Sequence, residues 1–556
     1  MLDHDWQGNT ESLVAPNCPP HMTTGALHLG QSSTGVFIRE LQNSIATPRP
    51  TPEPTRGITL DDFAGDHTPP PGNRISSDYV LPPRRDAERL LQIYRSVHYP
   101  VYPAIRWDDF LVDISALYDG SVPSNRCRMA HCLANLVFAL AERSILRETQ
   151  GNAGPDYFER AKRLLQFDIF GDISFQGIQA LILCAQYLQG VEKPRQCWVI
   201  VGLAIRAAQS IGLHVAEAVK NIQPLRDQCL ASIVWSCLVT IDRTLSMTLG
   251  RPPTLSLSAA RATGISNNVL IADQHECSPQ IPSFFIYSYR LFDILHDILA
   301  SLYGQGAKVP LGLEVLGHTS RLERELDRWT SGLPEELRLG SDNSAPLSQA
   351  HFLRQRCLQV LMILFRPGLS ATIKSPSSAT ADQDLEEATT WYCTTRCIEA
   401  ASEMVDIAIL QSEADARGTS VAPWWYNLQF CYNAGTSLLA ARLSGKTAER
   451  LGPLRLDESL AKCIRTLKSY GSLNSRCLSA FSSVAEKAGY VLPSMAIDDD
   501  NVTGASVQQF NFDSVDLSSL EGFVTEDCWS LDWASTSSTI FDQFGLLDDF
   551  MNANPS

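Results

Sequence analysis

The stretch RDQCLASIVWSCLVTIDRTLSMTLGRPP (residues 226–253) decides the fold of this chain. Its apolar residues continue without strand-like alternation, which indicates one long helix, and Gly250 followed by Pro252 and Pro253 ends it. The same helical spacing recurs at residues 129–140, 178–188, 198–208, 284–303, 314–331, 347–365, 390–412, 424–442 and 458–488. Gly212, followed by the apolar Leu213, stands where the C-terminal cap of the helix 198–208 would fall. Because alternating stretches are scarce, the sequence predicts an all-α body.

Both ends of the chain differ from this body. The first 78 residues hold ten of the 31 prolines and little apolar periodicity, except for GVFIRELQNSI (35–45), which could dock on the body. We therefore predict a large helical regulatory domain flanked by disordered N-terminal and C-terminal segments. The predicted segments are a Pro-rich linker-like segment (1–78), a helical domain (79–370), a loop (371–390), a helical extension of the same body (391–495) and an acidic–aromatic tail (496–556).

Composition limits the class of protein. With 44% hydrophobic and 19% charged residues, the chain is typical of a globular protein. No apolar run approaches the roughly 20 residues that span a bilayer, and the acidic N-terminus does not resemble a secretory signal. We therefore expect no membrane partner, a cytosolic or nuclear location, and cysteines that are buried, reduced thiols.

The net charge of −16 is concentrated at the C-terminus. Residues 498–556 contain twelve Asp or Glu and no Lys or Arg, which leaves 45 basic against 49 acidic residues in the rest of the chain. Because no segment has the dense Lys and Arg that phosphate binding requires, a DNA-binding domain is not visible in the sequence.

The C-terminal tail alternates acids with large hydrophobic residues, eight of them aromatic between 498 and 556. Acidic repulsion keeps such side chains solvated and free to bind a groove on another protein, where a short helix can form. The expected contacts are Trp529, Trp533, Phe541, Phe544, Leu547 and Phe550. The alternative is a C-terminal helix that folds back on the body.

The sequence contains none of the common catalytic, metal-binding or nucleotide-binding motifs. It contains no Cys-x-x-Cys pair, no His-Glu-x-x-His, no P-loop, no Gly-x-Ser-x-Gly and no Gly-x-Gly-x-x-Gly, so we predict no enzyme and no cofactor. Cys393 and Cys397 would share a helix face and could hold a metal, but core packing is the favoured interpretation. His98 and His214 have no acidic or Cys neighbours in motif spacing and are interpreted as helix-end or core histidines.

Three charged residues lie inside apolar helices: Arg206, Asp242 and Arg243. A buried charge must be paired, so the favoured interpretation is an ion pair that joins the helices 198–208 and 226–249. A polar floor for a small ligand between helices and plain solvent exposure are the alternatives.

Three stretches, in order, resemble the fungal-specific transcription factor domain, the helical middle region of fungal zinc-cluster regulators. They are YRSVHYPVYP (94–103), CWVIVGLAIRAAQSIGLH (197–214) and VWSCLVTIDRTLSMTLGRPPTL (234–255), and LFRP (364–367) is a weaker fourth. The signature residues that we expect to be structural or to line a ligand pocket are Arg206, His214, Asp242, Arg243, Gly250 and Arg251.

The resemblance implies a nuclear transcription regulator of a metabolic or biosynthetic gene set. Members of the family carry an N-terminal zinc cluster of six cysteines that reads DNA, whereas this sequence has only Cys18 before Cys127. We therefore expect DNA contact only through an upstream zinc cluster or a partner, and coactivator binding through the acidic tail. The alternative is a partner-dependent co-regulator, or a ligand-binding or dimerising module without DNA contact of its own; the family allows a homodimer or heterodimer.

Overall fold

The computed structural model describes residues 78–122, 124–145, 154–165, 174–220, 222, 225–263, 281–303, 313–339, 347–374, 383–471, 475–487 and 490–493. These residues form helices joined by turns, and none of them lies in a strand. The predicted all-α fold is therefore confirmed for this part of the chain. Residues 1–77, with the segment 35–45, and the tail 496–556 lie outside it.

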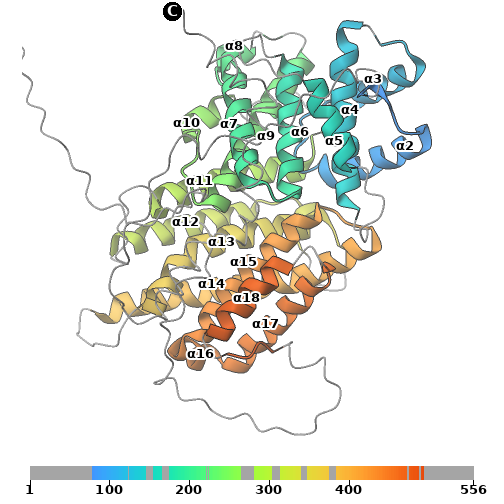
Figure 1. Cartoon of the computed structure of the whole chain (residues 1–556). Helices are drawn as coiled ribbons and strands as arrows, with labels where there is room; N and C mark the ends of the chain where they lie inside the picture. Colours follow the sequence, from blue (N-terminus) through green and yellow to red (C-terminus); the bar gives the residue numbers. More distant parts are fainter. Residues whose placement is uncertain are drawn as a thin grey trace, which may run out of the picture.

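Two groups of helices follow one another along the chain (Figure 1). The first contains α2 (Arg84–Ile93), the π-helix η3 (Tyr94–His98), α3 (Trp107–Asp119), α4 (Ser124–Ser144), α5 (Gly154–Leu165), α6 (Phe175–Gly190), α7 (Pro194–Ser210), α8 (Ala216–Lys220) and α9 (Leu225–Leu249). The second contains α10 (Leu257–Thr263), α11 (Ser283–Tyr303), α12 (Leu313–Ser331), the 3-10 helix η4 (Glu335–Leu337), α13 (Gln349–Lys374), α14 (Gln383–Arg417), α15 (Trp424–Leu443), α16 (Gly445–Leu451), α17 (Pro453–Lys468) and α18 (Ser475–Lys487). In Figure 1 the helices α4, α6, α7 and α9 stand side by side in the upper part, and α11 to α18 lie below and across them.

Helix α9 is the central helix of the first group. It contacts α6, α7, α8, α10 and α11, and every residue from 231 to 247 is buried. The segment Arg226–Leu249 is long and apolar enough to cross a membrane by composition, which corrects our expectation that no run is long enough. Because 94% of its most apolar window is buried inside the protein, α9 is a core helix here.

Glycines end two of these helices as predicted. Gly212 and Gly250 have φ angles of 81° and 64°, which lie in the left-handed region. Glycine adopts this conformation at little cost in free energy because it has no side chain. The amide of the next residue then closes the cap: Leu213 donates to Ala208 O and Arg251 donates to Ser246 O. Both turns are thus fixed by local sequence.

Helices α13 and α14 extend further than the sequence predicts. Residues 371–390 are expected as a loop, yet α13 continues to Lys374 and α14 begins at Gln383. Helix α13 passes through Pro367, which has no amide to donate to the Ile363 carbonyl. The Tyr303 hydroxyl on α11 donates to that carbonyl instead, at 2.7 Å, so the helix continues.

The early part of α14 was missed for a different reason. Residues 383–390 (QDLEEATT) offer almost no apolar periodicity, which is why they are predicted as loop. Acidic residues near a helix start interact favourably with the helix dipole, and this local effect does not depend on an apolar face.

The two groups of helices are joined by hydrogen bonds from α15 to the first group. The Trp424 indole donates to the Arg143 carbonyl at 2.9 Å, and the Tyr426 hydroxyl donates to Gln189 Oε1 at 2.7 Å. The Gln429 amide donates to Thr248 Oγ1 of α9 at 3.0 Å.

Most described cysteines are free and buried, as expected. Cys393 and Cys397 face the core from α14, where the Cys397 thiol lies 3.9 Å from the Met362 carbonyl. No group of three or more potential metal ligands is found among the described residues. Cys229 departs from the expectation of reduced thiols, because it is disulfide-bonded.

Candidate functional site

The ion pair of α9 joins different helices from those predicted. Arg243, 1% exposed, donates from Nη1 to Asp293 Oδ1 of α11 at 2.5 Å, and Arg261 of α10 donates to Asp293 Oδ2 at 2.9 Å. The expected pair between α7 and α9 is therefore wrong. Asp293 lies in the apolar stretch YRLFDIL (289–295), so the criterion that selected Arg243 could have found it.

Asp242 caps a turn instead of forming an ion pair. Its Oδ2 accepts hydrogen bonds from the backbone amides of Thr254 and Leu255 at 2.9 and 3.4 Å. Burial raises the pKa of this carboxyl to about 6, against the opposing effect of these hydrogen bonds and of the Arg243 charge. Asp242 thus holds the turn that follows Gly250 against the end of α9.

Arg206 is exposed and donates to Gln209 Oε1 of its own helix at 3.0 Å. It therefore forms no ion pair between helices, and the alternative of plain solvent exposure is the correct one for this residue. Its neighbour Ile205 is fully buried. Successive side chains on a helix are about 100° apart, which places Arg206 on the outer side of α7.

Two family-signature stretches meet at the end of α9. The guanidinium of Arg251 lies 5.0 Å from the centre of the Trp198 ring on α7, a cation–π contact between the second and third signatures. His214 packs near Trp235, with ring centres 6.2 Å apart, and its Nδ1 is buried without a hydrogen-bond partner in the described part of the chain. These predicted residues therefore form packing and turn contacts.

The first signature places a buried histidine between the two groups of helices. His98 Nε2 lies 3.0 Å from the Leu140 carbonyl and 2.6 Å from Ser144 Oγ, and the ring stacks on Tyr94. Because a carbonyl can only accept, Nε2 carries the proton. Burial lowers the pKa of His98 to about 3, so the imidazole is neutral. The interpretation as a core histidine is confirmed.

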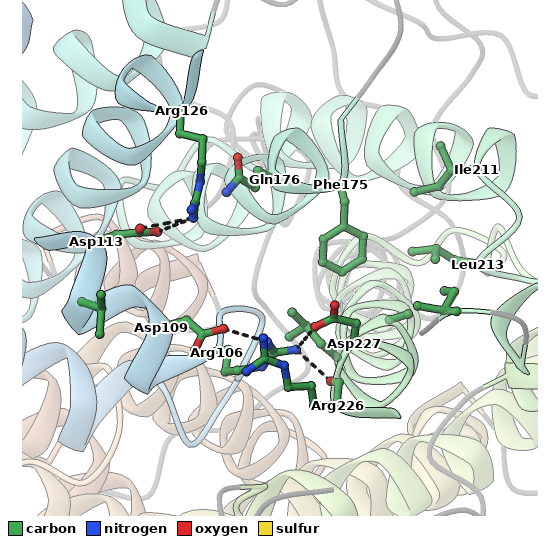
Figure 2. A pocket seen from close by; sticks show the side chains of 14 residues that line it. Arg106, Asp109, Asp113, Arg126, Phe175, Gln176, Ile211, Leu213, Arg226 and Asp227 are labelled. Atoms are coloured by element: carbon green, nitrogen blue, oxygen red, sulfur yellow. Dashed lines mark hydrogen bonds and ion pairs between the residues drawn. The ribbon is translucent and has the colours of Figure 1, made fainter. Parts of the chain in front are cut away.

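A pocket of about 790 Å³ opens between α3, α6, the end of α7 and the start of α9 (Figure 2). This volume is within the range of small-molecule sites. Its apolar wall consists of Phe175, Ile211, Leu213, Ile222, Leu230 and Ala231. Among the family-signature candidates none lines it, so sequence reasoning missed this site.

Paired charges form the opposite wall of the pocket (Figure 2). Arg106 donates to Asp109 Oδ2 at 2.7 Å and to Asp227 Oδ1 at 2.6 Å, which ties α3 to α9. Arg126 donates to both oxygens of Asp113 at 3.2 Å. Burial alone would lower the pKa of Arg106. The hydrogen bonds to Asp227 and Asp109 and their negative charges outweigh this effect, so the pKa of Arg106 is raised. Arg106 and Arg126 are thus paired with carboxylates, whereas Arg226, also in the lining, has no ion pair in the described part of the chain. The mixture of apolar and charged walls suits an amphipathic molecule.

The six aromatic and leucine residues predicted as tail contacts lie outside the described residues. They are Trp529, Trp533, Phe541, Phe544, Leu547 and Phe550. Their role stays a prediction from the sequence.

Comparison with known proteins gives one family and several named relatives. Residues 91–331 match the family described as fungal specific transcription factor domain. The sorbicillinoid biosynthetic cluster transcription factor sor3 of Hypocrea jecorina is 26% identical over 486 residues, which cover 81% of this chain and 68% of the relative. The sorbicillinoid biosynthetic cluster transcription factor 2 of Penicillium rubens is 26% identical over 463 residues, which cover 76% of this chain and 64% of the relative.

A third similar protein is the transcription factor FBD3 of Fusarium pseudograminearum. It is 23% identical over 474 residues, which cover 78% of this chain and 61% of the relative. This chain thus spans about two thirds of the length of these three relatives. All three are named transcription factors, in agreement with the resemblance of the three sequence signatures.

Proposed function

Because residues 91–331 are a fungal specific transcription factor domain, we propose that this chain is a nuclear transcription regulator of a biosynthetic or metabolic gene set and not an enzyme. The observation that carries the proposal is the family match, which covers the first three sequence signatures in order. Two similar proteins are named as regulators of sorbicillinoid biosynthetic clusters, which supports a gene-cluster role without identifying the genes.

The output of the regulator is proposed to be the acidic–aromatic tail, which binds a transcriptional coactivator. Twelve acids and eight aromatic residues between 498 and 556 support this role. Fusing residues 498–556 to an unrelated DNA-binding domain should activate a reporter gene. Replacing Phe541, Phe544 and Phe550 by Ala should abolish the activation, both in the fusion and in the full chain.

The matched control replaces Ser535, Ser537 and Ser538 by Ala in the same region, which leaves every acid and aromatic residue in place. This control should activate as the wild type does. Equal activation by the triple Phe variant, or none by the wild-type tail, would remove the tail from the proposal and leave the helical domain unaffected.

DNA contact is proposed to come from a binuclear zinc cluster or from a partner protein. The charge balance supports this, since residues 1–497 hold 45 basic against 49 acidic side chains with no dense basic segment. An exon rich in Cys-x-x-Cys in the genomic DNA upstream of the Met1 codon would favour the zinc cluster. Recruitment to chromatin that is lost when a second regulator is deleted would favour the partner.

A ligand-binding role for the body is the second candidate function, and the pocket of about 790 Å³ is the observation that favours it. The amphipathic fluorophore 8-anilinonaphthalene-1-sulfonate should bind the wild-type chain with saturable fluorescence. Leu230→Trp, which fills the apolar wall, should weaken this binding, whereas Leu454→Trp at an 83% exposed position should not. Equal binding to both variants would place the probe elsewhere.

A further inference from the structure

The pocket of Figure 2 has an apolar rim that faces solvent. Val112 of α3 and Ile211 at the end of α7 belong to its lining and are 68% and 42% exposed. Behind them lie the half-buried Phe175 and Leu230 and the buried Leu213. The rim and the floor thus form one apolar surface that reaches from the pocket to the outside of the protein. Exposed apolar surface of this kind marks an interaction site.

The charges in the lining of the pocket balance. Its arginines are matched in number by its aspartates, with Arg106, Arg126 and Arg226 on one side and Asp109, Asp113 and Asp227 on the other. A strongly charged partner of either sign therefore meets charges of its own sign. Of the three cations, Arg226 has no ion pair in the described part of the chain. The lining thus favours a partner that is apolar on one side, neutral overall and able to offer one carboxylate.

The segment GVFIRELQNSI (35–45), which lies outside the described residues, has these properties in its sequence. Its apolar residues have helical spacing and would share one face of a helix: Phe37, Ile38, Leu41 and Ile45. Its two charges, Arg39 and Glu40, cancel. Because Glu40 follows Phe37 by three residues, it would fall beside the apolar face of that helix.

The acidic–aromatic tail matches the pocket less well. Residues 498–556 contain twelve acids and no basic residue. The three aspartates in the lining repel such a segment, and Arg226 alone does not offset this repulsion. The charge balance therefore selects the N-terminal segment over the tail.

The chain between the segment and the body is long enough to reach the pocket. The described residues begin at Asp78, which pairs with Arg163 of α5 at 2.8 Å, and the Tyr79 ring packs on His131 of α4. Helix α4 contacts α3 and α6, which carry walls of the pocket. Residues 46–77 span about 30 Å as a flexible chain and about 100 Å when extended as polyproline II. For comparison, the 25 residues of α9 are about 37 Å long.

We propose that residues 35–45 dock as an amphipathic helix in this pocket, with the apolar face on Phe175, Leu213 and Leu230 and with Glu40 near Arg226. This is recognition of a helix by a groove, here within one chain. As far as it concerns ligands, the inference rests on the ligand-binding role proposed above: the docked segment competes with the ligand for the pocket.

Hydrogen exchange of the purified full chain, followed by mass spectrometry, tests the docking. With an effective concentration of about 1 mM and an intrinsic Kd of about 0.1 mM, the segment is docked about ten times as often as it is free. The amides of residues 35–45 in the wild type should therefore exchange about tenfold more slowly than those of an unfolded chain. Exchange at the unfolded rate would overturn the proposal.

Leu41→Asp and Asn43→Asp are a matched pair, because each adds one negative charge to the same segment outside the described body. In a helix, Leu41 lies on the apolar face and Asn43 on the opposite face. Leu41→Asp should raise the exchange rate of residues 35–45 to that of an unfolded chain, and Asn43→Asp should leave it slow. Equal exchange in the two variants would rule out docking through the apolar face.

Val112→Asp and Leu454→Asp locate the site on the body. Both replace an exposed apolar side chain, at 68% and 83% exposure, so both proteins should fold, and of the two only Val112 lines the pocket. Val112→Asp should abolish the slow exchange of residues 35–45, whereas Leu454→Asp should not. Slow exchange that persists in Val112→Asp would place the segment elsewhere and overturn the site.

Two further outcomes would assign the pocket to another occupant. Slow exchange of residues 541–550 that Val112→Asp abolishes would make the tail the occupant. Slow exchange of residues 35–45 that disappears on dilution would place the segment on a second copy of the chain. Either result would overturn docking of this segment within one chain.

Titration with 8-anilinonaphthalene-1-sulfonate separates this inference from the ligand-binding role. Leu41→Asp should bind the fluorophore about tenfold more tightly than the wild type, because the segment no longer competes. Equal affinity while residues 35–45 exchange slowly would overturn the competition and the ligand-binding role, but not the docking. Unfolded-rate exchange of residues 35–45, together with fluorophore binding that Leu230→Trp weakens, would overturn the docking and leave the ligand-binding role intact.

Discussion

Arg243 of α9 and Asp293 of α11 form a buried ion pair in which both carboxylate oxygens are used, the second by Arg261. Arg243 is 1% exposed on the side chain and Asp293 is 15% exposed, so solvent cannot replace the counter-charge that Asp293 supplies to Arg243. The pair fixes α11 against the central helix of the fold.

Asp293→Asn should therefore lower the free energy of unfolding by about 3–5 kcal/mol, because it leaves the buried guanidinium without a counter-charge. Arg261→Gln is the matched control: its side chain is 53% exposed, and its loss should cost only about 0–1 kcal/mol. Urea unfolding of both variants checks this. Equal losses would mean that the burial of Arg243 does not determine the strength of the pair.

His98 should make the fold sensitive to acid. Its pKa is about 3 in the folded protein, below the value of about 6.5 in an unfolded chain, so the stabilisation is complete above pH 6.5 and is lost as the pH falls toward 3. The slope for this one group approaches about 1.4 kcal/mol per pH unit. His98→Gln keeps a side-chain amide donor and cannot titrate.

Urea unfolding of the wild type and of His98→Gln at pH 7, 6 and 5 measures this contribution. The difference in unfolding free energy between the two proteins should shrink as the pH falls. Only the wild type loses the stabilisation that comes from the lowered pKa of His98. A difference that stays constant would show that His98 does not titrate differently in the two states.

Gly368 permits the close packing of α13 on α14. A Cβ added there would lie 2.3 Å from the Cys393 Cβ and 3.2 Å from the Thr390 carbonyl. Gly368→Ala should therefore destabilise the protein by about 1–3 kcal/mol, as overpacking does. Gly202→Ala on α7 meets nothing within 4 Å and should stabilise by about 0.5–1 kcal/mol through helix propensity. Thermal unfolding shows whether each variant is less stable or more stable than the wild type.

The Tyr303 hydroxyl should matter more when residue 367 is a proline than when it is not. Tyr303→Phe removes the donor to the Ile363 carbonyl and should cost about 1–3 kcal/mol. In a Pro367→Ala background the alanine amide can donate to the same carbonyl, so the same change should cost clearly less. The coupling energy from a double-mutant cycle measures the difference, and a value near zero would contradict this explanation of the continuous helix.

The sequence predicts the elements of this fold better than their contacts. The helix 226–249 and the caps at Gly212 and Gly250 follow from local patterns, and they are present as expected. The burial of Asp242 and Arg243 also follows from their apolar neighbours. Their partners do not, because the choice between α7 and α11 depends on how the helices are rotated and packed.

The pocket of Figure 2 and the aromatic rings around the buried Arg356 of α13 illustrate the same limit. The charged wall of the pocket combines Arg106 with Asp227, which are 121 residues apart. The rings around Arg356 include those of Tyr102 and Tyr426, which lie far apart in the sequence. Neither set has a spacing that a sequence pattern can reveal.

The hydrogen bonds from Trp424, Tyr426 and Gln429 to the first group of helices have a consequence for how the protein can be divided. The family match stops at residue 331, but α13 and α15 supply part of the core on which the matched helices pack. A fragment cut at residue 331 would expose that apolar surface to water. The stretch that matches the family is therefore shorter than the unit that folds.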